Sequence, residues 1–469
     1  MESRAELEGA LRRGALINAL GVVAKLGFPL LFLVTTWSLG SATTGVFALV
    51  FFAGEVLRGL AMGGYVDGVT LVASRDVARA PTVVRVALRS ATALAALVAL
   101  PVVLFADDLG AAFPAYPGLG PALALMGWSL PASAVLDVAL AATKARLVMH
   151  WQVLVDGLVR PSGLVVAALL ARDLHALMLG YLGVHLLAAG LALAALHRCF
   201  PLGSILAARG GAPELHRFAL PQSLNLTLGR YQSRLDAWIL GLFATPPSAL
   251  AFYATGALLA GTLREVRIVF STSLAPIAAR HHAARDRAAL EELLGRLAGW
   301  TTALTLPAML ALGLFHRELL VRIDPGYTGD TRFFLVLLVG PVASCALGLA
   351  GNLLSHCGHS RWSLANAVGI SALNTALSLA LVPTLGLLGA ALGTAVATAT
   401  LHVVQAVELR RLEGVRLRLP LRPLVGLALG TLALLGAGAP LAIRVLLFSA
   451  VVGVHALLVG VRLPTPVRS

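Results

Sequence analysis

The stretch VALRSATALAALVALPVVLFA, residues 86–106, contains a single charged side chain, that of Arg89. An α-helix of about 20 apolar residues is long enough to cross the hydrocarbon layer of a bilayer. Similar stretches recur along the whole 469-residue chain, in which 58% of the residues are hydrophobic and 12% are charged. A water-soluble fold could not bury so much apolar surface. The sequence therefore predicts an all-α polytopic membrane protein and excludes most soluble enzymes.

Fourteen apolar spans make up most of the chain and leave only short loops between them. The predicted spans are Ala15–Leu39, Thr43–Val66, Val86–Ala106, Gly118–Ala142, Trp151–Leu170, Leu174–Leu196, Phe218–Phe243, Ala249–Ala275, Leu297–Phe315, Phe333–Ser355, Trp362–Pro383, Leu387–Val407, Leu421–Ala439 and Leu441–Val461. The first span is too long for the core of a signal peptide and follows Arg12 and Arg13. We therefore expect it to remain as the first transmembrane helix.

The basic residues predict how the helices are oriented in the membrane. When successive loops are assigned to alternate sides, 24 of the 36 Lys and Arg residues lie in loops and termini on one side and 5 on the other. Cytoplasmic loops carry an excess of Lys and Arg, so both termini are expected in the cytoplasm. The net charge of +14 then reflects this topology and attraction to anionic headgroups, and nucleic-acid binding is not expected.

An internal repeat divides the predicted helices into two parallel sets. Arg75 aligns with Arg280 at an offset of 205 residues, and Trp151 aligns with Trp362 at an offset of 211. Parallel repeats are typical of transporters that bind their substrate between the two halves. The predicted domains are an N-terminal six-helix bundle at 1–200, a cytoplasmic linker at 201–213, a C-terminal six-helix bundle at 214–412 and two extra helices at 413–469.

Nine charged side chains lie at middle depth in the predicted spans, where a charge that faces lipid is costly. They are Lys25, Arg58, Arg160, Arg230, Arg234, Arg264, Glu55, Asp236 and Glu265, while Asp137 and Asp156 are expected nearer the cytoplasmic ends. One interpretation makes these charges structural ion pairs, which suits Glu55 and Arg58 because they are three residues apart on one helix. It also suits Asp156 and Arg160, which are four residues apart. The other interpretation places several of the charges around a hydrated central cavity.

The seventh predicted span, Phe218–Phe243, favours the cavity. Arg230 and Arg234 are expected to share one face of this helix. Two like charges in a low dielectric need an anion or water opposite them. Guanidinium groups match phosphate oxygens in geometry, so an excess of such cations predicts an anionic cargo.

Two stretches of the chain resemble a known family. The segment RLDAWILGLF at 234–243, and the stretch from Asn374 through Pro383, Gly386 and Gly389 to Thr394, resemble the polysaccharide (O-antigen type) flippases. These flippases belong to the MOP exporter superfamily, which also holds the MATE multidrug exporters and the lipid II flippase. The resemblance implies a carrier in the bacterial inner membrane that moves undecaprenyl-pyrophosphate-linked oligosaccharide from the cytoplasmic to the periplasmic leaflet. It implies alternating access coupled to H⁺ or Na⁺, in lipopolysaccharide O-antigen or other surface polysaccharide biosynthesis.

The charge pattern and the resemblance together predict the site residues. The expected substrate-binding residues are Lys25, Arg58, Arg230, Arg234 and Arg264, and the candidates for ion coupling are Glu55, Asp236 and Glu265. No catalytic residue, cofactor or metal is predicted. His356, Cys357 and His359 share one short loop, but no fourth ligand with suitable spacing accompanies them.

Three other functions are compatible with the sequence. A MATE-like exporter of cationic drugs would need carboxylates without partners at middle depth. A polysaccharide polymerase or ligase would resemble chains with a large periplasmic loop, whereas the longest loop expected outside is only 17 residues, His316–Arg332. A scaffold or regulator built on a transporter fold would keep the helices without the transport, because a fold alone does not determine function.

Overall fold

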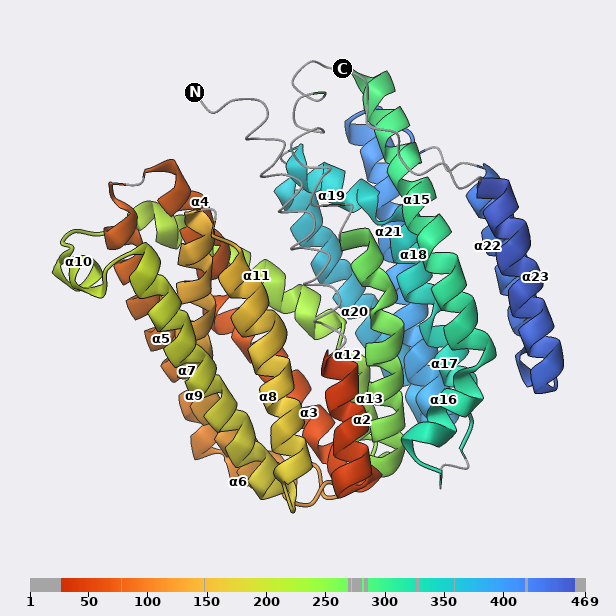
Figure 1. The fold of residues 1–469 in the computed structure, drawn as a ribbon, viewed down its shortest axis with the longest axis horizontal. Helices are drawn as coiled ribbons and strands as arrows, with labels where there is room; N and C mark the ends of the chain where they lie inside the picture. Colours follow the sequence, from red (N-terminus) through yellow and green to blue (C-terminus); the bar gives the residue numbers. More distant parts are fainter. Residues whose placement is uncertain are drawn as a thin grey trace. The chain divides into compact units, whose positions relative to one another are not determined.

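The computed structural model describes residues 27–76, 78–146, 148–268, 271, 281, 286–325, 329–357, 359–417 and 421–459. Every secondary-structure element among these residues is helical, which confirms the predicted all-α fold class. Ten helices in this part of the chain are long and apolar enough to cross a membrane, and the chain is a multi-pass membrane protein (Figure 1). The total of fourteen spans remains a prediction.

The chain separates into two compact units, Met1–Thr255 (unit 1) and Gly256–Ser469 (unit 2). Unit 1 contains α2 (Gly27–Leu39), α3 (Ser41–Arg58), the π-helix η1 (Gly59–Gly63), α4 (Gly64–Arg75), α5 (Ala80–Leu104), α6 (Ala106–Ala111), α7 (Leu119–Ala145), the π-helix η2 (Gln152–Val159), α8 (Arg160–Leu170), α9 (Leu174–Cys199), α10 (Leu202–Ala207), α11 (Pro213–Gln232) and α12 (Leu235–Leu242). Helix α13 (Pro247–Gly261) crosses the boundary. Unit 2 contains α15 (Arg287–Leu314), α16 (His316–Ile323), α17 (Arg332–Leu337), α18 (Val339–Leu347), α19 (Leu349–His356), α20 (Ser360–Leu385), α21 (Leu387–Leu412), α22 (Leu421–Leu434), the 3-10 helix η3 (Leu435–Gly438) and α23 (Leu441–Val459). The predicted division into bundles at 1–200 and 214–412 remains a prediction.

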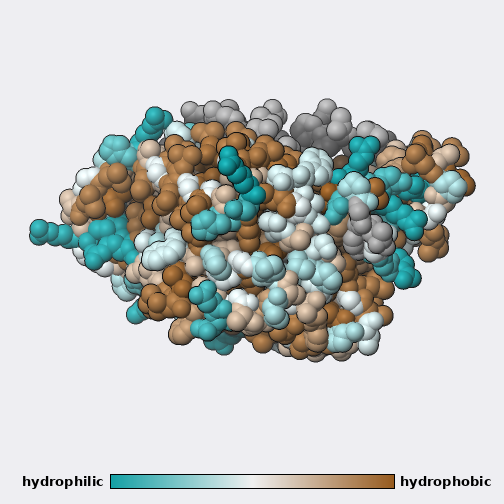
Figure 2. All heavy atoms as spheres, turned by 90° about the horizontal axis from the view of Figure 1, so that it is seen from below, coloured by the Kyte–Doolittle hydropathy of each residue, from teal (hydrophilic) through white to brown (hydrophobic). Residues whose placement is uncertain are grey.

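Helix α7 lies at the core of unit 1 and packs against α3, α4, α5 and α9. Small residues allow transmembrane helices to approach each other closely. Every fourth residue of α5 from 87 to 99 is a buried alanine: Ala87, Ala91, Ala95 and Ala99. The opposite side of α5 carries Leu97 and Leu104, which are 65% and 66% exposed. On the face that Figure 2 shows, apolar residues cover a large part, with hydrophilic residues among them.

Two of the long helices of unit 1 contain π-helical segments. Helix α3 continues through η1 into α4, and η2 continues into α8. Arg58 is the last residue before η1, and Arg160 is the first residue after η2. Because π-helical segments occur frequently at functional sites, both buried arginines mark positions of interest.

The predicted span Phe218–Phe243 is not one continuous helix, because α11 ends at Gln232 and α12 begins at Leu235. In a continuous α-helix the N–H of residue 234 would bond to the carbonyl of residue 230. Instead, the Ser233 hydroxyl donates to the Arg230 carbonyl oxygen at 2.9 Å, and the Arg234 N–H donates to the Tyr231 carbonyl oxygen at 3.0 Å. The prediction that Arg230 and Arg234 share one helical face is therefore wrong.

In unit 2, α15 packs against α18, α22 and α23. Arg444 of α23 donates to Glu318 of α16 at 2.7 Å and to the carbonyl oxygen of Leu314 at 2.8 Å. His455 Nε2 lies 3.1 Å from the carbonyl oxygen of Ala303 on α15. These contacts attach the described part of the predicted C-terminal pair, 413–469, to the rest of unit 2.

Candidate functional site

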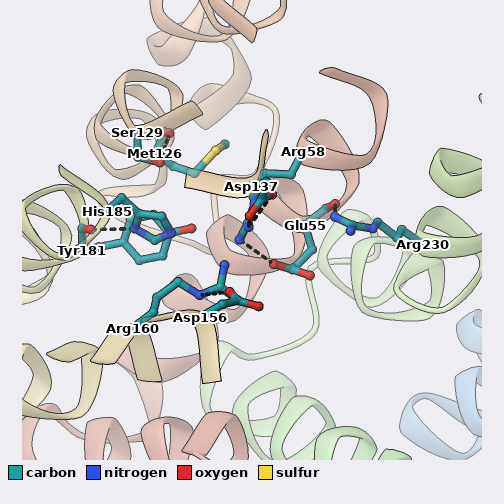
Figure 3. Close-up of polar contacts among 10 residues, drawn as sticks. All are labelled: Glu55, Arg58, Met126, Ser129, Asp137, Asp156, Arg160, Tyr181, His185 and Arg230. Carbon is teal, nitrogen blue, oxygen red and sulfur yellow. Dashed lines mark hydrogen bonds and ion pairs between the residues drawn. The ribbon is translucent and has the colours of Figure 1, made fainter. Parts of the chain in front are cut away.

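Unit 1 encloses a group of charged side chains, the buried charge cluster (Figure 3). Its members are Glu55 and Arg58 of α3, Asp137 of α7, Asp156 of η2 and Arg160 of α8. Arg58 and Arg160 are 5% and 7% exposed, so both residues are buried. Buried charges need partners of opposite sign, and the cluster supplies carboxylates from three elements.

Arg58 has two carboxylate partners. Its Nη2 donates to Oδ1 and Oδ2 of Asp137 at 2.9 and 2.8 Å, and its Nη1 donates to Oε1 of Glu55 at 3.4 Å. The ion pair between Glu55 and Arg58 predicted from their spacing is thus confirmed. The shorter contact comes from another helix, where Asp137 is half-buried.

Arg160 forms the second predicted pair, with its Nε 3.3 Å from Oδ1 of Asp156. The Phe28 ring lies under its guanidinium, with the ring centre 5.2 Å from Cζ. Its Nη1 is buried and has no hydrogen-bond partner among the residues that the structure describes. Arg160 therefore keeps a donor that a ligand or water could satisfy.

Two residues of α9 lie beside the cluster on the side away from Arg230 (Figure 3). His185 Nδ1 is 2.8 Å from the Tyr181 carbonyl oxygen, the two rings are 4.2 Å apart, and both residues are buried. Neither residue was predicted as part of a site, and neither was Asp137. The sequence signal that could have pointed to two of them is the Asp137 carboxylate and the His185 imidazole, each within an otherwise apolar span.

Arg230 lies on the other side of the cluster, near the end of α11 (Figure 3). Its Nη1 donates to the main-chain carbonyl oxygen of Glu55 at 2.9 Å. Because this acceptor is neutral, the contact holds the guanidinium in place without neutralising its positive charge. Arg234, beyond the break in the helix, stacks on Phe52 with its Cζ 4.4 Å from the ring centre.

Asp236 lies in the first turn of α12 and is 4% exposed. Its Oδ2 accepts a hydrogen bond from the Tyr253 hydroxyl at 2.5 Å, and its Oδ1 accepts one from the Ala237 N–H at 2.9 Å. This carboxylate is thus held by the hydroxyl of α13 and by the start of its own helix.

The remaining predicted residues lie elsewhere. Arg264 and Glu265 are half-buried residues of unit 2, just after α13. Lys25 lies outside the described residues. Of the predicted set, the structure brings together Glu55, Arg58 and Arg230, with Arg234 beside Phe52 of the same helix α3.

No protein-family model matches this sequence, and no curated protein sequence matches it. Solved structures do resemble it. The chain is similar to the lipid II flippase MurJ in an inward closed conformation, with a TM-score of 0.67 and 10% identity over 94% of this chain and 97% of that one. It is also similar to an inward-facing multidrug resistance MATE transporter of the MOP superfamily, with a TM-score of 0.68 and 11% identity over 85% of this chain and 98% of that one. A Vibrio cholerae MATE transporter, VcmN in its bent form, gives a TM-score of 0.58 and 15% identity over 87% of this chain and 98% of that one.

The chain has the fold of the MOP superfamily. The resemblance inferred from the sequence is thereby confirmed at the level of the fold. Identities of 10% to 15% leave the individual site residues to be argued from the geometry of this chain.

Within this MOP-superfamily fold, the charges of the cluster balance those around it. The carboxylates of Glu55, Asp137 and Asp156 formally cancel the guanidinium groups of Arg58, Arg160 and Arg230. Only Arg230 reaches the group through a neutral oxygen. Counted together with Arg230, the cluster is therefore charge-balanced, and it is an ion-pair network rather than a surplus of cations.

Proposed function

We propose that this protein is a flippase that moves undecaprenyl-pyrophosphate-linked oligosaccharide from the cytoplasmic to the periplasmic leaflet of a bacterial inner membrane. The observation that carries the proposal is the placement of Arg230 and Arg234 on either side of the α11–α12 break. One guanidinium is held by a main-chain carbonyl and the other by an aromatic ring, both on α3. Two cations held in this way suit a pyrophosphate, because guanidinium groups bind phosphate oxygens through paired N–H donors.

The buried charge cluster lies beside Arg230 and supports this site (Figure 3). Asp137 fixes Arg58, and Arg58 fixes the Glu55 side chain, whose main chain in turn holds Arg230. In this proposal Arg58 positions Arg230 and does not bind cargo in the arrangement seen here. A rigid supporting layer is what a binding site requires if its groups are to be held in place.

Ion coupling is the second part of the proposal. Glu55, Asp236 and Glu265 remain the candidates for binding H⁺ or Na⁺ during alternating access. Asp236 combines deep burial with a hydrogen bond to Tyr253. A carboxylate that takes up a proton or cation in a low dielectric changes the local charge, and such a change can bias two conformations.

The test is flipping of a fluorescent undecaprenyl-pyrophosphate oligosaccharide in proteoliposomes. We expect Arg230→Ala combined with Arg234→Ala to reduce the initial rate at least about tenfold, the effect of losing charge-assisted hydrogen bonds to an anion. The matched control is Arg209→Ala combined with Arg217→Ala, which removes two exposed arginines of the same unit and should flip at the wild-type rate. A double variant at 230 and 234 that transports as fast as its control would overturn the proposal.

A MATE-like exporter of organic cations is the second candidate. The observation in its favour is that some of the similar solved structures are MATE transporters. The three carboxylates of the buried cluster do not add to it, because each is paired with an arginine. The same proteoliposomes decide between the two. Efflux of a cationic dye, with no movement of any polyprenyl-pyrophosphate substrate, would favour the exporter.

A further inference from the structure

Two arginines at one end of unit 1 each lie over an aromatic ring. Cζ of Arg146, which directly follows α7, is 4.9 Å from the ring centre of Phe200, which directly follows α9. Cζ of Arg198, in the last turn of α9, is 5.2 Å from the ring centre of Trp151, which directly precedes η2. The four residues therefore join the ends of three helices, and we refer to them as the stacked arginine edge.

The stacked arginine edge follows from the topology. Helices α7, η2–α8 and α9 follow one another in the chain and pack together, so the ends of α7 and α9 meet the start of η2. This is the end of unit 1 at which α10 lies (Figure 1). Phe200 is 4% exposed and Trp151 is half-buried, whereas both guanidinium groups are on the surface. The rings thus form a fixed base for two exposed cations.

The donors of these two guanidinium groups are open. Neither the Arg146 guanidinium nor the Arg198 guanidinium forms a hydrogen bond or ion pair with any residue in the described part of the chain. Other arginines at this end are occupied: Arg79 pairs with Glu214 at 3.0 Å, and Arg85 donates to the Gly210 carbonyl oxygen at 2.7 Å. A guanidinium stacked on a ring keeps its N–H edge free for an oxygen anion.

The depth of the edge matches that of lipid headgroups. Arg146 directly follows the apolar helix Leu119–Ala145, and Arg198 is the residue before the end of the apolar helix Leu174–Cys199. Trp151 directly precedes the apolar helix Gln152–Leu170. Trp and Arg at the ends of transmembrane helices lie at the level where phosphates of the bilayer surface are found.

We propose that the stacked arginine edge binds the phosphate of an anionic phospholipid headgroup. The site would hold one lipid at the boundary between α7, η2 and α9, with the phosphate oxygens accepting from Arg146 and Arg198. The acyl chains would follow the apolar helices that end there. The site does not depend on the cargo of the proposed flippase, and it would couple the packing of three helix ends to the composition of the surrounding membrane.

The experiment measures lipid selectivity in reconstituted membranes. Spin-labelled phosphatidylglycerol and spin-labelled phosphatidylcholine are compared for the fraction that the protein immobilises. Two surface arginines favour an anionic lipid, so we expect the wild-type protein to prefer phosphatidylglycerol by about threefold or more. Arg146→Ala combined with Arg198→Ala should lower that preference to near one.

The matched control is Arg89→Ala combined with Arg217→Ala, which also removes two exposed arginines from unit 1. This control should keep the wild-type preference. If both double variants lose the preference for phosphatidylglycerol equally, the effect comes from general surface charge and the proposed site is overturned. An unchanged preference in the variant at 146 and 198 would overturn it as well.

A third variant covers the case in which the alanine variant does not fold. Arg146→Lys combined with Arg198→Lys keeps both charges but loses the planar groups that stack and bind phosphate through two donors. We expect its preference for phosphatidylglycerol to fall at least halfway towards one. Wild-type selectivity in this folded variant would show that charge alone suffices and would overturn the proposed geometry.

Discussion

Nη2 of Arg58 on α3 lies 2.8 Å from Oδ2 of Asp137 on α7. The two residues are 79 positions apart, so this ion pair joins two helices that are distant in the sequence. Both helices belong to the core of unit 1, and the Arg58 guanidinium is almost completely removed from solvent. Removal of one member would leave the other as a buried charge without its main partner.

Arg58→Ala should therefore destabilise the protein strongly. Loss of one partner of a buried pair typically lowers the free energy of unfolding by about 3–5 kcal/mol. The measurement is unfolding of the purified protein in mixed micelles with increasing SDS, followed by circular dichroism. Arg89→Ala, an exposed arginine of α5, is the control and should unfold at the wild-type midpoint.

The double variant Arg58→Met with Asp137→Leu tests whether the pair or the burial of apolar surface stabilises the core. Similar-sized apolar residues can replace a buried pair with little loss, or even with a gain. We expect this double variant to unfold at a higher SDS concentration than Arg58→Ala. If its loss of stability equals the sum of the losses of Arg58→Met and Asp137→Leu measured singly, the two residues do not interact as the structure describes.

Tyr116 gives the protein a sensitivity to alkaline pH. The residue precedes α7, outside the membrane-spanning segments, and its hydroxyl donates to the Thr245 carbonyl oxygen at 2.7 Å. Burial raises the pKa of the Tyr116 phenol above its ordinary value of 10.0. A raised pKa means that the folded protein favours the protonated form. The stabilisation is complete below the ordinary pKa and is lost as the pH rises towards the folded value.

We expect the wild-type protein to lose stability above pH 10 more steeply than Tyr116→Phe, which has no phenol to ionise. At pH 7 we expect the wild-type protein to be the more stable of the two, because the variant lacks a buried hydrogen bond that contributes about 1 kcal/mol. Thermal unfolding of both proteins between pH 7 and 11 provides the comparison. Parallel curves for the two proteins across this range would contradict the assignment.

The features predicted from the sequence are those that depend on neighbours along the chain. The apolar spans and the pairs Glu55–Arg58 and Asp156–Arg160 follow from composition and from the period of the helix. The described part of the chain contains both pairs and ten helices long enough to span a membrane. The contact between Arg58 and Asp137 could not be predicted in this way, because it depends on which helices pack together. The expectation that Asp137 lies nearer the cytoplasmic end of its helix gave no indication of this partner for the same reason.

The break between α11 and α12 also could not be predicted from the pattern of apolar residues. Neither Gly nor Pro occupies positions 231–236, so nothing in the local composition signals the end of a helix. At the interruption, the Ser233 hydroxyl bonds to the carbonyl oxygen that the next turn of a continuous helix would use. Serine competes with the backbone for such groups only in some contexts, so the residue type alone does not predict a break.

Gly64 provides the last prediction, on the packing that holds α11 against α4. A Cβ atom at this position would lie 1.9 Å from the carbonyl oxygen of Ala219, so only glycine allows the two backbones to meet. The Gly64 N–H also donates to the Ser223 hydroxyl at 3.0 Å. Gly64→Ala must push α11 away, and overpacking of this kind costs about 1–3 kcal/mol.

The matched control is Gly183→Ala on α9, where an added Cβ would meet no atom within 4 Å. That substitution should leave stability unchanged or raise it slightly, because alanine favours a helix more than glycine does. Both variants are compared by SDS unfolding and by flipping rate. Since α11 also carries Arg230, displacement of α11 by Gly64→Ala should slow flipping as well as destabilise the protein. Equal stability and equal rates in the two variants would show that α4 and α11 are not in close contact in the membrane.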